Sequence, residues 1–144
     1  MVLIKKDKMK KLFFSFGAAL LLTSCGTTLS TISSRLGKSQ SSLTNTKWTL
    51  ADYVKGKTPT LNIENNKITG NAGCNNYFGS LSTDISTGQF ITGDLGSTRM
   101  RCDNMAVEKS YLDMLEKANK YVVSESTLEL YQDNLLLLKF NKAQ

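Results

Sequence analysis

Three cysteines and a complete lack of histidine limit the chemistry open to this 144-residue chain. Cys74 lies in the stretch GCNNYFG, and Cys102 ends the stretch STRMRC. Cys74 could act as a nucleophile, as a metal ligand or as half of a disulfide. A cysteine nucleophile is usually activated by histidine, and structural zinc sites usually gather four Cys or His ligands. The composition therefore weakens the first two interpretations.

Carboxylates and arginines form two further groupings. Asp113 and Glu116 fall on one side of an expected helix, where a solvated surface is the simpler interpretation. Arg99 and Arg101 either present donors to a carboxylate or phosphate, or Arg99 pairs with Glu108 or a backbone carbonyl to hold the helix on the sheet. We favour the pairing. No G-x-S-x-G elbow is present. We expect a protein that is not an enzyme, with no catalytic residues, metal or cofactor.

The elements that must position these residues are mainly strands. Four stretches alternate apolar and polar residues, as strands do: KWTLADYV from residue 47, TLNIENNKITG from residue 60, YFGSLSTDISTGQFITG from residue 77 and STLELYQDNLLLLKFN from residue 126. The last three each contain a turn, at residues 65–66, 86–88 and 132–134. They predict antiparallel hairpins.

One segment, from Asp103 to Lys120, predicts a helix. Asp103 is the expected N-cap. We expect Met105 and Met114 to pack against the sheet, together with Tyr111. The apolar face predicted by the three- and four-residue spacing comprises Val107, Tyr111, Met114, Leu115 and Ala118. The fold class expected is mainly β (α+β), with an antiparallel sheet that forms a small barrel or a half-barrel and one helix packed on it.

Residues 1–24 have the layout of a secretory leader. Lys10 and Lys11 precede an apolar run that is too short to span a bilayer comfortably. Residues 22–25, Leu-Thr-Ser-Cys, resemble the lipobox of bacterial lipoproteins, which implies a lipid such as palmitate on Cys25 and a membrane anchor. Because Gly26 rather than aspartate follows, we expect a cell-envelope protein of the outer membrane rather than the inner membrane.

The remainder divides into a tether and a domain. Residues 25–42 are rich in Ser and Thr and predict a flexible tether, followed by a domain at residues 43–144. The formal net charge of +6 arises largely from the leader, since the part from residue 43 onward has nine lysines, two arginines and 11 acids. A nucleic-acid binder needs a basic stripe, so we expect no nucleic-acid partner.

Two cysteine-containing elements resemble those of the META domain, or HslJ-like, family of bacterial envelope lipoproteins. The first combines Gly70, Cys74, Asn75, Tyr77 or Phe78, and Gly79. The second combines Thr98, Arg99, Met100 and Cys102, followed by the helical acid Glu108 and a final hairpin with Leu128 and Leu130. The resemblance covers most of residues 43–140. It implies a lipocalin-like barrel with a helix, no established catalytic activity, and an association with stress responses such as heat shock.

Cys25 is assigned to lipid, which leaves Cys74 and Cys102 in an exported domain. We therefore predict a disulfide between them. Gly73 and Gly79 would let the chain turn and approach closely, and Asn75 and Asn76 would satisfy backbone groups around the bridge.

The functional expectation is a non-enzymatic interaction or stress-related role at the envelope. The alternative is a barrel that binds a small apolar ligand in the periplasm or at the cell surface. The partners expected are the membrane, through Cys25, and either an envelope protein or that ligand.

Overall fold

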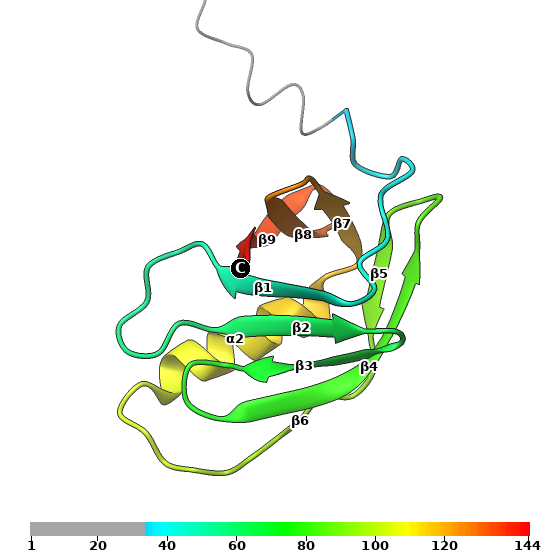
Figure 1. The fold of residues 1–144 in the computed structure, drawn as a ribbon. Coiled ribbons are helices and arrows are strands. Elements are labelled where there is room, and N and C mark those ends of the chain that lie inside the picture. Colours follow the sequence, from blue (N-terminus) through cyan, green and yellow to red (C-terminus); the bar gives the residue numbers. More distant parts are fainter. Residues whose placement is uncertain (1–33) are drawn as a thin grey trace, which may run out of the picture.

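The computed structural model describes residues 34–144, which form nine strands and one helix (Figure 1). Seven of the strands lie in the alternating stretches of the sequence, whereas the strands Gly96–Ser97 and Lys120–Val123 were not predicted. The predicted leader and Cys25 lie outside the described residues. The elements are β1 (Thr46–Leu50), β2 (Thr60–Glu64), β3 (Lys67–Asn71), β4 (Asn76–Asp84), β5 (Gln89–Thr92), β6 (Gly96–Ser97), α2 (Met105–Lys117), β7 (Lys120–Val123), β8 (Thr127–Gln132) and β9 (Leu135–Lys142).

Eight of these strands close into an antiparallel barrel. Their order is β3-β2-β1-β9-β8-β7-β5-β4, and β4 pairs back to β3. Closure depends on the length of β4, because its first half pairs with β3 and its second half with β5. The short β6 lies beside β4 at Tyr77 and Phe78. The fold is therefore mainly β with one packed helix, and of the two expected forms the closed barrel is the one observed.

The predicted turns join the strands as expected. Asn65 and Asp133 occupy the left-handed region, with φ of 51° and 53°, at the tips of the β2–β3 and β8–β9 hairpins. Asn and Asp tolerate this conformation better than other residues with side chains. All three predicted hairpins are confirmed, as β2–β3, β4–β5 and β8–β9.

Large side chains fill the barrel interior. The fully buried ones include Trp48, Tyr77, Phe90, Tyr111, Tyr121 and Phe140. Tyr111 enters from α2 and contacts three strands: its hydroxyl lies 2.9 Å from that of Tyr77 on β4 and 3.3 Å from the Thr60 carbonyl on β2, and its ring packs edge-on against Phe140 of β9. Figure 1 shows the helix crossing behind β1, β2 and β3. The helix thus plugs the barrel with an aromatic side chain.

The helix is shorter than predicted and has a different cap. It begins at Met105, and its N-cap is Asn104 rather than Asp103. The Asn104 side chain donates to the Lys55 carbonyl at 2.9 Å instead of capping the helix, while its carbonyl accepts the first helical bond from Val107. Met105 is 42% exposed, so its expected packing against the sheet is wrong. Within residues 34–144, no helix is long and apolar enough to cross a membrane.

The described end of the predicted tether contacts the barrel. Gln40 is buried; its backbone N–H donates to the Ile85 carbonyl, and its side-chain oxygen accepts from the N–H of Val123 on β7. Arg35 donates to the Val123 carbonyl at 2.6 Å, and the Tyr121 hydroxyl donates to Ser41. The ordered unit therefore includes residues 35–42 as well as the predicted domain, because these residues bond free backbone groups at the end of β7.

Candidate functional site

A disulfide joins the turn after β3 to the segment before α2. Cys74 and Cys102 are bonded, with their Cα atoms 6.0 Å apart. Residues 98–104, which we call the strap, run from β6 to α2 and are fastened at Cys102. Thus two segments that are 28 residues apart in the sequence are covalently linked, as the sequence predicted.

Asn75 fastens the strap a second time. Its side-chain oxygen accepts from the Thr98 hydroxyl at 2.8 Å and from the Met100 N–H at 2.7 Å, and its side-chain nitrogen donates to the Met100 carbonyl at 3.0 Å. Only 1% of Asn75 is exposed. A side-chain amide that hydrogen-bonds both the N–H and the C=O of one residue pairs with its backbone as a neighbouring strand would. Asn75 therefore fixes the backbone of the strap.

Glu108 completes the arrangement from α2. Its carboxylate accepts from the Asn75 N–H at 3.0 Å and from the Asn75 side-chain nitrogen at 2.9 Å. Glu108 is 6% exposed although its side chain is acidic. Hydrogen bonds from two donors offset much of the cost of burying a carboxylate. The disulfide, Asn75 and Glu108 together are called the brace below.

The predicted pairing of Arg99 with Glu108 is wrong. The donors to Glu108 are those of Asn75, and among the described residues the ion pairs are Lys117–Asp113 and Lys139–Glu129. Arg99 and Arg101 are both exposed. The reason is geometric: Asn75 already bonds the buried Glu108 carboxylate, whereas the side chains of Arg99 and Arg101 are exposed.

The sequence left open whether Tyr77 or Phe78 faces the core. Tyr77 is 1% exposed, and Phe78 is 60% exposed. The Phe78 ring lies over Gly96 of β6, where an added Cβ would come within 2.6 Å of it. Alternation along β4 therefore places Tyr77 inside the barrel.

The two glycines have different roles. Gly73 has φ +102°, a conformation that side chains strongly disfavour, in the turn before Cys74. A Cβ at Gly79 would lie 2.6 Å from the Leu95 side chain. Gly73 thus permits the turn, and Gly79 permits the close approach of the segment that leads into β6.

Two tyrosine hydroxyls form a buried polar pair next to the brace. Tyr77 donates to the Thr60 carbonyl at 2.8 Å and lies 2.9 Å from the Tyr111 hydroxyl. Burial raises the pKa of Tyr77 and of Tyr111 above the ordinary value of 10.0, because an anionic phenolate would lose its hydration there. The sequence analysis did not anticipate this pair, since hydrophobic periodicity gives no information on hydroxyl contacts.

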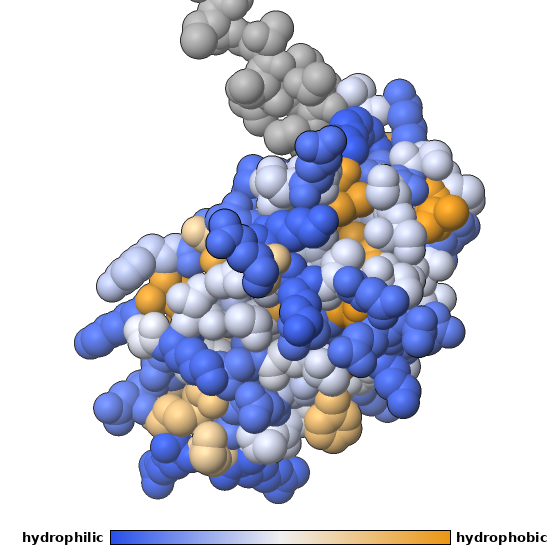
Figure 2. All heavy atoms as spheres, in the orientation of Figure 1, coloured by the Kyte–Doolittle hydropathy of each residue, from blue (hydrophilic) through white to orange (hydrophobic). Residues whose placement is uncertain are grey.

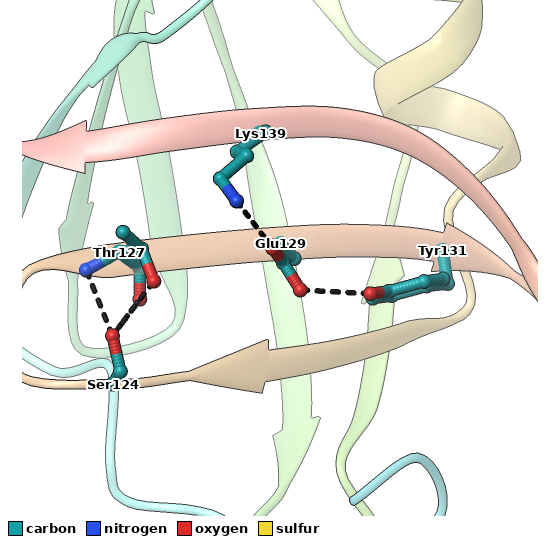
Figure 3. Close-up of polar contacts among 5 residues, drawn as sticks. All are labelled: Ser124, Thr127, Glu129, Tyr131 and Lys139. Atoms are coloured by element: carbon teal, nitrogen blue, oxygen red, sulfur yellow. Dashed lines mark hydrogen bonds and ion pairs between the residues drawn. The ribbon is translucent and has the colours of Figure 1, made fainter. Parts of the chain in front are cut away.

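A second buried carboxylate was also missed. Glu129 on β8 accepts from the Tyr131 hydroxyl at 2.7 Å and from the Lys139 ammonium of β9 at 2.8 Å (Figure 3). Burial first, and then the hydrogen bond to Glu129, raise the pKa of Tyr131. The available signal was Glu129 between Leu128 and Leu130, directly opposite Lys139 in the hairpin register. Its contacts are those of a cross-strand stabilising pair.

The brace has little free capacity for chemistry. The two N–H groups and the oxygen of the Asn75 amide are all bonded, and the Thr98 hydroxyl both donates to Asn75 and accepts from the Asn76 N–H. In the part of the chain that the structure describes, no group of three His, Cys, Asp or Glu side chains is placed to hold a metal ion. The brace holds the backbone of the strap in place, and the side chains of the strap form the exposed surface beside it.

The geometry defines the class as a small, closed antiparallel barrel plugged by one helix and braced by a disulfide. The family model named META domain matches residues 41–144, so the chain belongs to the META domain family. No significant match was found among the curated proteins.

Solved structures share the fold. An NMR structure of a protein from Burkholderia xenovorans is 27% identical, covers 71% of this chain and 84% of its own, and has a TM-score of 0.61. Another NMR structure, 18% identical, covers 75% and 92% with a TM-score of 0.52. The crystal structure of a duf4847 family protein from Bacteroides vulgatus ATCC 8482 is 12% identical, covers 69% and 93%, and has a TM-score of 0.52. The latter two support the fold alone.

Proposed function

We propose that this META-domain protein is a lipid-anchored component of the bacterial cell envelope that acts by binding another envelope protein rather than by catalysis. The observation that carries the proposal is the brace. Its polar groups are bonded to one another, whereas side chains of the strap are presented outward. A buried network of this kind stabilises the conformation of the strap surface and leaves no polar group of its own free to react.

The proposed anchor rests on the sequence. Residues 22–25 and the basic, apolar stretch before them resemble a lipoprotein leader, which would place lipid on Cys25. Gly26 favours the outer membrane. A stress-related role follows from the family resemblance.

The filled barrel gives less support to the small-ligand alternative. Carriers of the lipocalin type keep an internal space for one ligand. Here Tyr111 occupies the centre and contacts three strands, and further aromatic rings pack around it. An apolar ligand would have to displace these side chains to enter the barrel.

The test compares the full chain with Cys25→Ser and with Cys102→Ser as a matched cysteine control, all expressed in a bacterial host. Cells are fed an alkyne-labelled fatty acid, membranes are fractionated, and the protein is recovered with its neighbours. We expect label and outer-membrane fractionation for the wild type and for Cys102→Ser, and neither for Cys25→Ser. Label retained by Cys25→Ser would contradict the anchor. Failure to recover any specific protein neighbour with the wild type would contradict the interaction role.

A further inference from the structure

The strap carries an exposed surface that the brace does not use. Arg99, Met100, Arg101 and Met105 line a cleft of about 340 Å³ between the strap and the first turn of α2. We call these four residues the distal patch. Met100 is 58% exposed, and both arginines are exposed. Two methionines and two arginines thus share one outward-facing hollow.

The charge of the distal patch is not neutralised by ion pairs. Among residues 34–144, the ion pairs are formed by Lys117 and Lys139, so neither arginine has an acidic partner. The one carboxylate that lines the cleft, Glu108, is held by Asn75. Arginine guanidinium groups recognise carboxylates in a planar, bidentate manner. The patch therefore complements an acidic group.

The apolar component indicates a protein partner. Arg and Met are enriched in protein–protein interfaces, while exposed clusters of large apolar side chains are otherwise disfavoured. Methionine is flexible and adapts its shape to different apolar partners. Free inorganic anions would use the arginines but gain nothing from Met100 and Met105.

The strap is also fixed before any partner arrives. The disulfide holds Cys102, and Asn75 holds both backbone groups of Met100. A preordered backbone lowers the entropy lost on binding, which raises affinity without adding contacts. Arg99, Met100 and Arg101 lie on or directly beside these fastened residues.

The strap lies at the end of the molecule opposite residues 34–42, which are the described residues nearest in sequence to the proposed anchor. Figure 1 shows residues 34–42, in cyan, at the upper end of the molecule and the strap, in yellow-green, at the lower end. Figure 2 shows pale orange apolar residues set among blue polar ones at the same lower end. A partner that extends away from the anchoring membrane could reach this surface.

From these observations we infer that the distal patch binds a segment of an envelope protein that carries Asp or Glu side chains next to apolar ones. This inference rests on the proposed envelope role and names the face and the chemistry of the partner. The acidic side chains would contact Arg99 and Arg101, and the apolar ones would cover Met100 and Met105.

The experiment places a photo-crosslinking amino acid at Met100, or at the exposed control position Lys67 on β3, in the full chain in its own envelope. Mass spectrometry then identifies the cross-linked molecule and the segment reached.

The variant Arg99→Glu/Arg101→Glu is compared with the control Lys47→Glu/Lys67→Glu, which changes the net charge equally on β1 and β3. In both variants the cross-linker stays at Met100. A peptide copied from the captured segment, and a version with Gln and Asn for its acids, are titrated against each protein.

We expect the Met100 probe to cross-link to a segment that contains acidic and apolar residues. Arg99→Glu/Arg101→Glu should abolish the cross-link and weaken binding of the peptide at least about tenfold, whereas the control pair should leave both unchanged. Cross-links to lipid, binding unaffected by the arginine reversal, or equal binding of the neutralised peptide would overturn the inference. Protein cross-links at Lys67 alone would overturn it and spare the proposed function. No protein cross-link at either position, with no neighbour recovered by co-purification, would overturn both.

Discussion

At the scale of single residues, Asn75 links the strap to the helix. Its side chain serves Thr98, Met100 and Glu108, which belong to the strap and the helix. The hydroxyls of Tyr77 and Tyr111 are likewise buried, and their hydrogen-bond partners are each other and the Thr60 carbonyl. Polar groups of this kind stabilise only when every partner is present.

Replacing Asn75 by Ala should therefore be severely destabilising. The change removes the side-chain donor to Glu108, whose carboxylate keeps only the backbone N–H of residue 75, and it leaves the N–H and C=O of Met100 without their partner. We expect a loss of about 3 kcal/mol or more in the free energy of unfolding. Urea denaturation followed by circular dichroism measures it. Asn66→Ala, in an exposed turn, is the control and should change stability by less than about 0.5 kcal/mol. Similar losses for both variants would show that the hydrogen bonds of the Asn75 side chain contribute little to stability.

The tyrosine pair predicts sensitivity to alkali. Both pKa values are raised in the folded state, so folding favours the protonated hydroxyls. The contribution to stability is complete below the ordinary pKa of 10.0 and is lost as the pH rises above it towards the folded values. Unfolding in urea at pH 8, 10 and 11 should show a steep fall for the wild type. Tyr111→Phe should be less stable at pH 8 but lose less between pH 10 and 11. Parallel curves for the two proteins would contradict the assignment.

At the scale of elements, the strap is an irregular segment made rigid by contacts at both ends and at its middle. β6 holds its start through β4, Asn75 holds Met100, and the disulfide holds Cys102. Its backbone has few partners of its own in regular structure. The fixed geometry of the strap is thus imposed by the elements on either side of it.

Removing the disulfide should cost a large part of the stability. For two cysteines 28 residues apart, the chain-entropy model gives about 3–4 kcal/mol. We expect Cys74→Ala/Cys102→Ala, and the wild type in dithiothreitol, to lose this amount in urea denaturation. The double variant should show no further loss in dithiothreitol. If the reductant weakened both proteins equally, its effect would not come from this bridge.

At the scale of the whole molecule, the barrel has one weak seam. β5 and β7 share a single paired position, Gln89 with Lys120, together with backbone bonds from Phe90 and Tyr121. β8 and β9 are paired along six positions. Gln40 bridges the seam by bonding to Ile85 on one side and Val123 on the other. The segment before the predicted domain thus helps to keep the barrel closed.

Gln40→Ala should therefore open this seam selectively. Hydrogen exchange followed by NMR should show faster exchange at the amides of Tyr121 and Val123, because regions with few contacts open at low free energy. The amides of Leu130 and Leu138 should be unaffected. Gln132→Ala, at an exposed position, is the control. Uniformly faster exchange across the barrel would instead indicate a global loss of stability.

Much of the architecture could be predicted because its signals are local. Alternation gave the hairpins, turns were expected at residues 65–66 and 132–134, where Asn65 and Asp133 are left-handed, and the helical spacing placed Tyr111 and Leu115 on the buried face. The cap was wrong because Asn104 is held by Lys55, a residue far away in the sequence. The Arg99–Glu108 pairing was wrong because Asn75 is the residue that donates to the Glu108 carboxylate. The Asn104–Lys55 and Asn75–Glu108 contacts produce no periodic pattern in the sequence.

The sequence by itself determined the family, the cysteine pair, seven of the nine described strands and the helix that packs on them, since these depend on residue types and short-range spacing. Only the tertiary structure decided that the sheet closes, that Tyr77 rather than Phe78 points inward, that residues 35–42 bridge the seam, and that Arg99 and Arg101 face outward. The physical reason is that these features arise from hydrogen bonds and packing between segments that meet only after the barrel has formed.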